Sequence, residues 1–309
     1  MKFFYIRTSH TSKTLKATIN NNTQDNIMDY LSSHNPFFKN WFLLKEKLYT
    51  DTINDSILNC TCQFFLKSEK NDIPRPHGSG VFIEYKETKY LVSAAHVLEN
   101  HYDKTFLILD DNNLKLGGTL FVSELPIGCE KRDDDYTDIA VMKLDQMSID
   151  KLSKHNIDFL KQERLDTNHK VDEHTNYIIF GFPAAKTDLR FKNTVEAIAM
   201  ETGVVESEKC YTKYHLTSTD NIIAKYNRRG LFSNKNPIIH TGVNPYGISG
   251  CGLWSVTNMK PEKGKVIPTT LVGILTTWIS HDSKMIATHI SKVLNFIDNE
   301  MNYLKKGGL

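Results

Sequence analysis

The stretch Tyr246-Gly247-Ile248-Ser249-Gly250-Cys251-Gly252-Leu253 places a serine between glycines at the start of an apolar strand. Because glycine has no side chain, backbone N–H groups beside the serine hydroxyl can point toward a bound group. Acyl transfer needs such donors to stabilise a developing oxyanion. A glycine-serine pair alone is equally typical of a tight β-turn, so its interpretation depends on other parts of the chain.

Two upstream segments supply a histidine and an aspartate. His96 follows the apolar run Tyr90-Leu91-Val92-Ser93-Ala94-Ala95, which predicts a strand that ends at the imidazole. Asp138 begins the apolar strand Asp138-Ile139-Ala140-Val141-Met142. A histidine after a strand is more often structural, and the neighbouring acids at 133–135 offer alternatives to Asp138. The three segments together favour a nucleophilic site.

These segments resemble the trypsin-like (chymotrypsin-fold) serine peptidases, in particular stand-alone members of the bacterial type. The resemblance covers roughly residues 55 to 298, and its matching pieces are 78–83 with 90–98, 138–144, 177–183, 247–253, 271–275 and 286–297. The order His, Asp, Ser is also the family's order. The resemblance implies a mainly β fold with two packed antiparallel six-stranded β-barrels and a C-terminal helix.

The resemblance also implies a domain organisation. Residues 53–309 would form the peptidase domain, with a first barrel at about 53–147 and a second at about 171–298. The segment between them, about 148–170, is predicted to be a surface linker with a helix. Two barrels of this kind need roughly 200–250 residues, which leaves room for one appended segment.

That appended segment is the N-terminal extension, residues 1–52. It begins with a short strand-like run and then favours helices, since Asn35 and Pro36 are typical of a helix start. An aromatic stripe around Trp41 follows on one helical face. The extension is either a helical collar packed on the barrels or a docking element for a regulatory protein partner, and both interpretations remain open.

Carried over to this chain, the resemblance implies a His96, Asp138 and Ser249 triad. Ser249 would be the nucleophile, His96 the general base, and Asp138 the residue that orients the imidazole. The N–H groups of Gly247 and Ser249 would form the oxyanion hole. The implied function is a serine endopeptidase acting on a protein or peptide substrate, with no cofactor and no metal. The alternative is a catalytically silent barrel that serves as a binding or scaffolding module.

Cys251 offers a competing nucleophile, because viral relatives of this fold use cysteine. With Cys251 in that role, Ser249 would stand where the family has glycine. With Ser249 in that role, Gly247 and Leu253 coincide with the family's glycine and leucine. We therefore expect Ser249 to be the nucleophile and Cys251 to be a small buried side chain.

Position 248 and the implied substrate pocket depart from the secreted members. Those enzymes have an aspartate before the serine that pairs with a new N-terminus, and Ile248 cannot form that ion pair. We hypothesise that the chain does not mature in this way. Val243 would be the pocket base, and Thr276, Thr277 and Trp278 would line the edge that pairs with substrate. The absence of an acid at position 243 favours a small or apolar P1 residue.

Charge, cysteine content and hydropathy narrow the choice of binding partners and of cellular compartment. The formal net charge of +2 gives no strong attraction to nucleic acid or to an anionic membrane. The five cysteines show no metal-binding spacing, and Val97 stands where secreted members often have a disulfide cysteine. The N-terminus lacks a sustained apolar run, and no segment reaches membrane-spanning length. We therefore expect a cytoplasmic protein.

Overall fold

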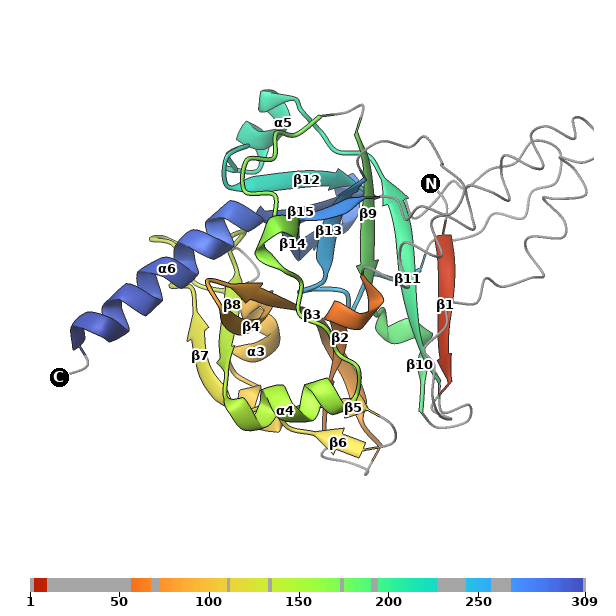
Figure 1. The fold of residues 1–309 in the computed structure, drawn as a ribbon. Helices are drawn as coiled ribbons and strands as arrows, with labels where there is room; N and C mark the ends of the chain where they lie inside the picture. The colour runs from red at the N-terminus through yellow and green to blue at the C-terminus, as the bar shows by residue number, and fades with distance from the viewer. Residues whose placement is uncertain are drawn as a thin grey trace, which may run out of the picture.

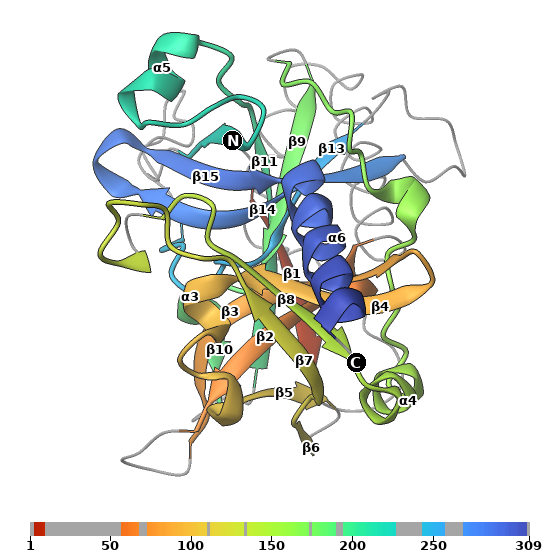
Figure 2. The same cartoon turned by 90° about the vertical axis from the view of Figure 1, so that its left-hand side faces the viewer.

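The protein forms two antiparallel β-sheets, one above the other in Figure 1 and seen from the side of helix α6 in Figure 2. The structure is a computed structural model. It describes residues 3–9, 57–67, 73–109, 112–132, 135–172, 175–189, 194–226, 243–256 and 268–307.

The first sheet has seven strands in the order β6-β5-β2-β3-β4-β8-β7. Its strands are β2 (Thr61–Leu66), β3 (Arg75–Tyr85), β4 (Thr88–Ala94), β5 (Thr105–Leu109), β6 (Asn112–Leu114), β7 (Gly118–Val122) and β8 (Ile139–Leu144). Alternate residues of β3 face opposite sides, as a strand requires. Val81 and Ile83 join the core between the sheets, whereas Phe82 joins a core formed by the first sheet and the helical segments packed on it.

The second sheet has eight strands, in the order β1-β11-β9-β13-β14-β15-β12 with β10 paired to β11. Its strands are β1 (Phe3–Ser9), β9 (Asn176–Gly181), β10 (Thr187–Asp188), β11 (Thr194–Thr202), β12 (Asn221–Lys225), β13 (Gly252–Val256), β14 (Thr269–Ile279) and β15 (Lys284–His289). An isolated bridge between Val204 and Ala224 brings the chain after β11 beside β12, so the sheet curls back on itself.

In the described part of the chain, four α-helices accompany the sheets: α3 (Ala95–Leu98), α4 (Gln146–Lys154), α5 (Glu208–Lys213) and α6 (Ile290–Gly307). Helix α4 begins after Asp145, whose carboxylate accepts the N–H of Ser148 at 2.7 Å and so caps the helix. The C-terminal α6 is amphipathic. Its apolar residues recur at helical spacing and bury into the core between the sheets: Ile290, Val293, Leu294 and Ile297.

The predicted fold class is confirmed in its main features, which are two antiparallel β layers and a C-terminal helix. The predicted count of six strands per layer is wrong. β6 extends the first sheet as a hairpin with β5, while β1 and β10 both pair with β11. An exposed strand edge offers unpaired N–H and C=O groups, and β1 satisfies those of β11.

The N-terminal extension is described only over β1, which is a strand of the second sheet. The helices predicted near residues 27–48 lie outside the described residues. The helix predicted between the two barrels is α4. The division into domains at residues 52, 147 and 170 stays a prediction.

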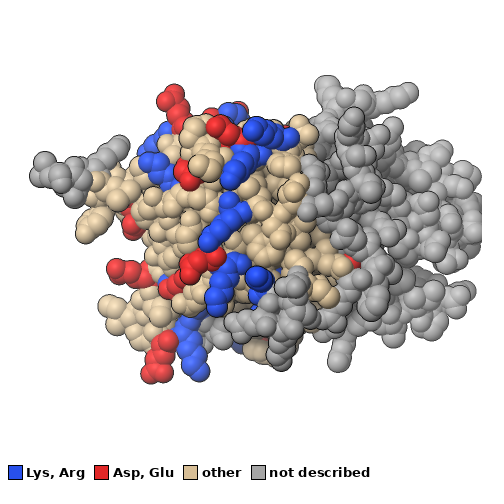
Figure 3. Space-filling view, turned by 90° about the horizontal axis from the view of Figure 1, so that it is seen from below, with Lys and Arg blue, Asp and Glu red and all other residues tan. Residues whose placement is uncertain are grey.

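The surface seen in Figure 3 carries a band of Lys and Arg side chains with Asp and Glu beside them. This mixture agrees with the small net charge of the chain, +2. Within the described ranges, no helix is both long enough and apolar enough to cross a bilayer.

Candidate active site

The pairing of β4 with β8 brings His96 and Asp138 together. Ala94, the last residue of β4, lies opposite Ile139, the first residue of β8. The chain turns into α3 after Ala94 and carries His96 in its first turn, while Asp138 directly precedes β8. The main chain fixes this corner as well, because the N–H of Ala95 donates to the carbonyl of Asp138 at 2.9 Å.

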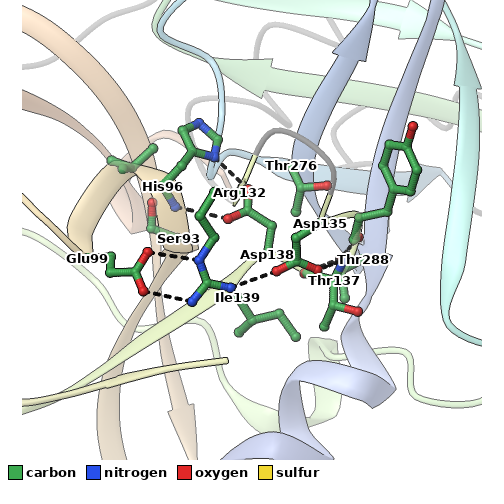
Figure 4. Close-up of polar contacts among 12 residues, drawn as sticks. Ser93, His96, Glu99, Arg132, Asp135, Thr137, Asp138, Ile139, Thr276 and Thr288 are labelled. Carbon is green, nitrogen blue, oxygen red and sulfur yellow. Dashed lines mark hydrogen bonds and ion pairs between the residues drawn. The ribbon is translucent and has the colours of Figure 1, made fainter. Parts of the chain in front are cut away.

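Both carboxylate oxygens of Asp138 contact His96 (Figure 4). Oδ2 lies 2.5 Å from the ring atom Nδ1, and Oδ1 accepts the backbone N–H of His96 at 2.9 Å. An ionised carboxylate only accepts hydrogen bonds, so Nδ1 carries the proton and Nε2 of the neutral ring is unprotonated. Asp138 is 1% exposed and His96 is 34% exposed. The imidazole is therefore oriented from its buried side and can accept a proton from the solvent side.

Asp138 has a buried carboxyl group and an unfavourable backbone conformation. Burial raises the pKa of its carboxyl, and the hydrogen bonds from His96 act in the opposite direction. Its backbone has a φ of 36°, in the left-handed region that costs an ordinary residue roughly 1–2 kcal/mol. Such a conformation persists only where the surroundings hold it, and it is concentrated at functional sites.

Ser249 stands in a loop of the second sheet that contacts β3 and β4 of the first sheet. Its carbonyl accepts the N–H of Ser79 from β3 at 2.8 Å. The next residue, Gly250, has a φ of 87°, and a Cβ there would lie 2.1 Å from the Ser79 carbonyl and 2.2 Å from the Ser93 hydroxyl. Ser93 is three residues before His96. Because Gly250 has no side chain, the serine loop can approach β4, the strand that ends two residues before His96.

Ser79 is fully buried and fixes the glycine-rich loop with its side chain. Its hydroxyl donates to the carbonyl of Gly247 at 2.9 Å and accepts the N–H of Phe182 at 3.2 Å. The carbonyl of Tyr246 accepts the N–H of Ala184 at 2.8 Å. Both peptides that flank Gly247 are therefore held in place.

These contacts determine where the Gly247 N–H points. In a trans peptide the C=O and N–H point in opposite directions, so the Gly247 N–H points away from Ala184. Among the described residues, the N–H groups of Gly247 and Ser249 donate to no protein acceptor. Gly247 has a φ of 93°, which glycine adopts without strain. The loop thus offers two backbone donors, as the predicted oxyanion hole requires.

Ile248 and Cys251 point into the core of the second sheet. Ile248 is 3% exposed and Cys251 is fully buried, and both lie in one apolar cluster. Burial raises the pKa of the Cys251 thiol well above its ordinary value, so this group stays a thiol at neutral pH. A buried thiol is a poor nucleophile, which favours Ser249 over Cys251.

Of the predicted substrate-binding residues, Thr276, Thr277 and Trp278 lie in the last part of β14, and Val243 lies in the segment before the serine loop. β14 pairs with β13 only up to Ile274, whereas it pairs with β15 through Thr277, Trp278 and Ile279. Beyond Leu275, no described strand pairs with the other edge of β14. The Thr276 hydroxyl points inward, donating to the Ile286 carbonyl at 3.3 Å, and Thr276 itself is buried.

Val243 lies beside this edge in an apolar environment. Its carbonyl accepts the hydroxyl of Tyr226, whose ring meets the ring of Trp278 edge-on at 6.3 Å between centroids. Met285, opposite Trp278 on β15, belongs to the same cluster as Val243. The side chains near Val243 are thus two aromatic rings and a methionine, and none of them is an acid.

The sequence did not reveal two parts of the site. Ser79 lies in the segment 78–83, which belongs to the resemblance, but nothing in the sequence indicates that its hydroxyl would reach Gly247. Arg132 and Asp135 near Asp138 form an ion pair at 2.7 Å, and Arg132 also binds Glu99 (Figure 4). No sequence signal pairs Arg132 with Glu99, which lies 33 positions away. In the described part of the chain, no group of three or more His, Cys, Asp or Glu side chains could hold a metal ion.

No protein-family model matches the chain, and no curated protein sequence matches it. Similar solved structures include an inactivated protease paralogue of the scabies mite, with a TM-score of 0.48, 12% identity, and coverage of 80% of this chain and 95% of that chain. Another is the VesB protease of Vibrio cholerae, with a TM-score of 0.47, 12% identity, and coverage of 79% and 64% respectively.

Proposed function

We propose that this chain is a serine endopeptidase that cleaves peptide bonds through an acyl-enzyme. The observation that carries the proposal is the contact of both Asp138 carboxylate oxygens with His96, at 2.5 and 2.9 Å. The serine loop adds two N–H groups that donate to no protein acceptor among the described residues. His96 Nε2 takes the proton of the Ser249 hydroxyl as its oxygen attacks the scissile carbonyl. The same proton later passes to the leaving amine.

The N–H groups of Gly247 and Ser249 bind the oxyanion that forms in this step. Such donors act best when they are oriented before the reaction. The peptide that carries the Gly247 N–H is held through its carbonyl by the Ala184 N–H at 2.8 Å. The peptide that carries the Ser249 N–H is held through its carbonyl by the Cys251 N–H at 3.0 Å. Asp138 stabilises the imidazolium ion that forms when His96 accepts the proton. Its burial strengthens this attraction, because the local dielectric constant is lower than that of water.

The substrate binds as an extended strand beside Thr276, Thr277 and Trp278. Beyond Leu275, one edge of β14 pairs with no described strand, which supports this proposal, since an added strand would satisfy its backbone groups. The P1 side chain is small or apolar. Support comes from Trp278, Tyr226 and Met285, which take up space around Val243 and supply no carboxylate for Arg or Lys.

The oxyanion loop is formed without N-terminal processing. Ile248, which stands where secreted members have an aspartate, packs in the apolar cluster of the second sheet and needs no ion pair. The protein acts in the cytoplasm, and the lack of any disulfide among its five cysteines supports a reducing compartment. Residues 1–52 are a candidate docking segment for a regulatory protein partner.

A fluorophosphonate probe tests the proposed nucleophile. We expect it to label the wild-type protein and to leave Ser249→Ala unlabelled, while Cys251→Ala is labelled like the wild type. Circular dichroism of each variant checks that the fold is retained. Absence of wild-type labelling, with the fold intact, would favour the alternative of a silent binding or scaffolding module. Labelling of Ser249→Ala would show that another residue is the nucleophile.

A further inference from the structure

The corner that holds His96 and Asp138 is supported by a buried arginine. Arg132 is 12% exposed, and its guanidinium binds three residues, Glu99, Asp135 and Ser123. It donates to both carboxylate oxygens of Glu99, at 2.8 and 2.9 Å. It donates to Asp135 Oδ2 at 2.7 Å. It also donates to the carbonyl of Ser123, next to the end of β7. Figure 4 shows Arg132 between Glu99 and Asp135.

Each of these partners is close to a member of the pair. Glu99 is the C-cap residue of α3, three residues after His96. Asp135 is three residues before Asp138, and its Oδ1 accepts the N–H of Thr137 at 2.8 Å. The Ser123 hydroxyl accepts the N–H of Ile139, the residue after Asp138, at 3.0 Å. Arg132 therefore joins the helix that carries the imidazole to both sides of the aspartate.

We propose that Arg132 is a positioning residue, which holds His96 and Asp138 in the geometry that the reaction needs. The inference rests on the proposed function for its catalytic consequence. Arg132 does not touch the reacting atoms. It acts by fixing α3 relative to the turn at 135–138, through Glu99 on one side and Asp135 on the other.

The strained backbone of Asp138 explains why such support is needed. A φ of 36° is unfavourable for aspartate, so the turn would relax if its contacts were lost. The second sheet supports the same turn, because the Thr288 hydroxyl donates to the Thr137 carbonyl at 2.7 Å. That contact does not reach α3. Among the described residues, Arg132 is the side chain that contacts both α3 and the turn before Asp138.

The chemistry of arginine suits this task. A planar guanidinium can bind one carboxylate with two parallel hydrogen bonds and still donate to a second, which a lysine ammonium cannot do in the same geometry. Asp135 is fully buried and Glu99 is 33% exposed. The hydrogen bond from Arg132 lowers the pKa of Glu99, which keeps this carboxylate ionised. The cluster is thus a charged, hydrogen-bonded support and not an apolar contact.

The test compares the rate of fluorophosphonate labelling and the steady-state kinetics of four variants with the wild type. The variants are Arg132→Met, Arg132→Lys, Glu99→Gln and the control Arg164→Met. Arg164 is a matched control because it is also a largely buried arginine, donating to Thr269 Oγ1 at 2.7 Å, and it lies outside the His96 corner. All rates are measured at a temperature at which each variant is folded.

We expect Arg132→Met to lower the labelling rate and kcat by about 10- to 100-fold, with KM changed little, because misplaced catalytic groups lose rate and not substrate affinity. Arg132→Lys should recover part of the rate, and Glu99→Gln should lower it less. The control should lose stability without losing rate. Wild-type rates in Arg132→Met would overturn the proposal. If that variant does not fold, a wild-type rate in Glu99→Gln would overturn it.

A spectroscopic measurement separates this proposal from the proposed function. The proton on His96 Nδ1 should give a low-field NMR signal, assigned by its loss in His96→Ala, because it lies in a 2.5 Å bond to Asp138. The signal does not depend on turnover. A shifted or lost signal in Arg132→Met, but not in Arg164→Met, supports the positioning role even if the wild type is not labelled. An unchanged signal in Arg132→Met would overturn it.

Discussion

Removal of one hydroxyl, in Ser79→Ala, should weaken the oxyanion loop. The Ser79 hydroxyl is the partner of two groups, the Gly247 carbonyl at 2.9 Å and the Phe182 N–H at 3.2 Å. Ser79 is fully buried and Phe182 is 6% exposed, so water does not easily replace the lost bonds. The Ser79 N–H keeps its bond to the Ser249 carbonyl, because that bond uses only the main chain.

The magnitude follows from these two bonds. A buried polar group that loses its partner costs about 1–3 kcal/mol, so two such groups predict a loss of about 2–6 kcal/mol in the free energy of unfolding. The catalytic effect is separate. The Gly247 carbonyl shares its peptide with the Ile248 N–H, which keeps its bond to the Pro245 carbonyl at 3.1 Å. Without the Ser79 hydroxyl this peptide is held on one side only, so Gly247 is fixed less firmly and its own N–H is less well aimed at the oxyanion. We expect kcat to fall by about 10- to 100-fold, less than complete loss of a donor would cause.

Urea unfolding measures the first effect, and turnover of a peptide ester measures the second. Ser255→Ala is the matched control, because Ser255 is a buried serine like Ser79. It lies in β13 of the second sheet, and its hydroxyl bonds to Thr270 Oγ1 at 2.8 Å, away from the loop. It should lose stability and keep kcat. The reasoning is refuted if Ser79→Ala keeps the wild-type kcat, or if Ser255→Ala lowers kcat equally.

Two further predictions concern Cys251 and His77. Cys251→Ala should keep the wild-type labelling rate, and it should lose about 1–2 kcal/mol in the free energy of unfolding because it leaves a small cavity. In the folded wild-type protein, a thiol reagent should not modify Cys251. Rapid modification would contradict the burial argument. Burial, with the neighbouring His101, lowers the pKa of His77 from 6.5 to about 4, so the unfolded state takes up a proton at a higher pH than the folded state. The free energy of unfolding should therefore fall as the pH drops from 6.5 toward 4, by about 1–2 kcal/mol after allowance for partial exposure. His77→Gln should flatten this part of the curve in urea titrations, and an equally steep curve would refute the assignment.

Local patterns in the sequence were sufficient to single out His96, Asp138 and Ser249 as candidate catalytic residues. The apolar run before His96, the strand after Asp138 and the glycines around Ser249 each fix a strand end or a turn, and these are local properties. The resemblance carried by these segments implied two antiparallel layers and a C-terminal helix, which the structure confirms. The roles of the three residues in catalysis stay a prediction until labelling tests them.

Contacts between distant segments decided the rest. The bonds of Ser79 to the serine loop join residues 168 positions apart, and Arg132 reaches Glu99 across 33 positions. The addition of β1 to the edge of β11 raised the strand count above six in the same way. Side-chain partners of this kind depend on sheet register and on the space left by neighbours, neither of which is written in a local pattern. The sequence by itself therefore determined which residues stand at the ends of the strands, whereas only the tertiary structure decided what holds them in place.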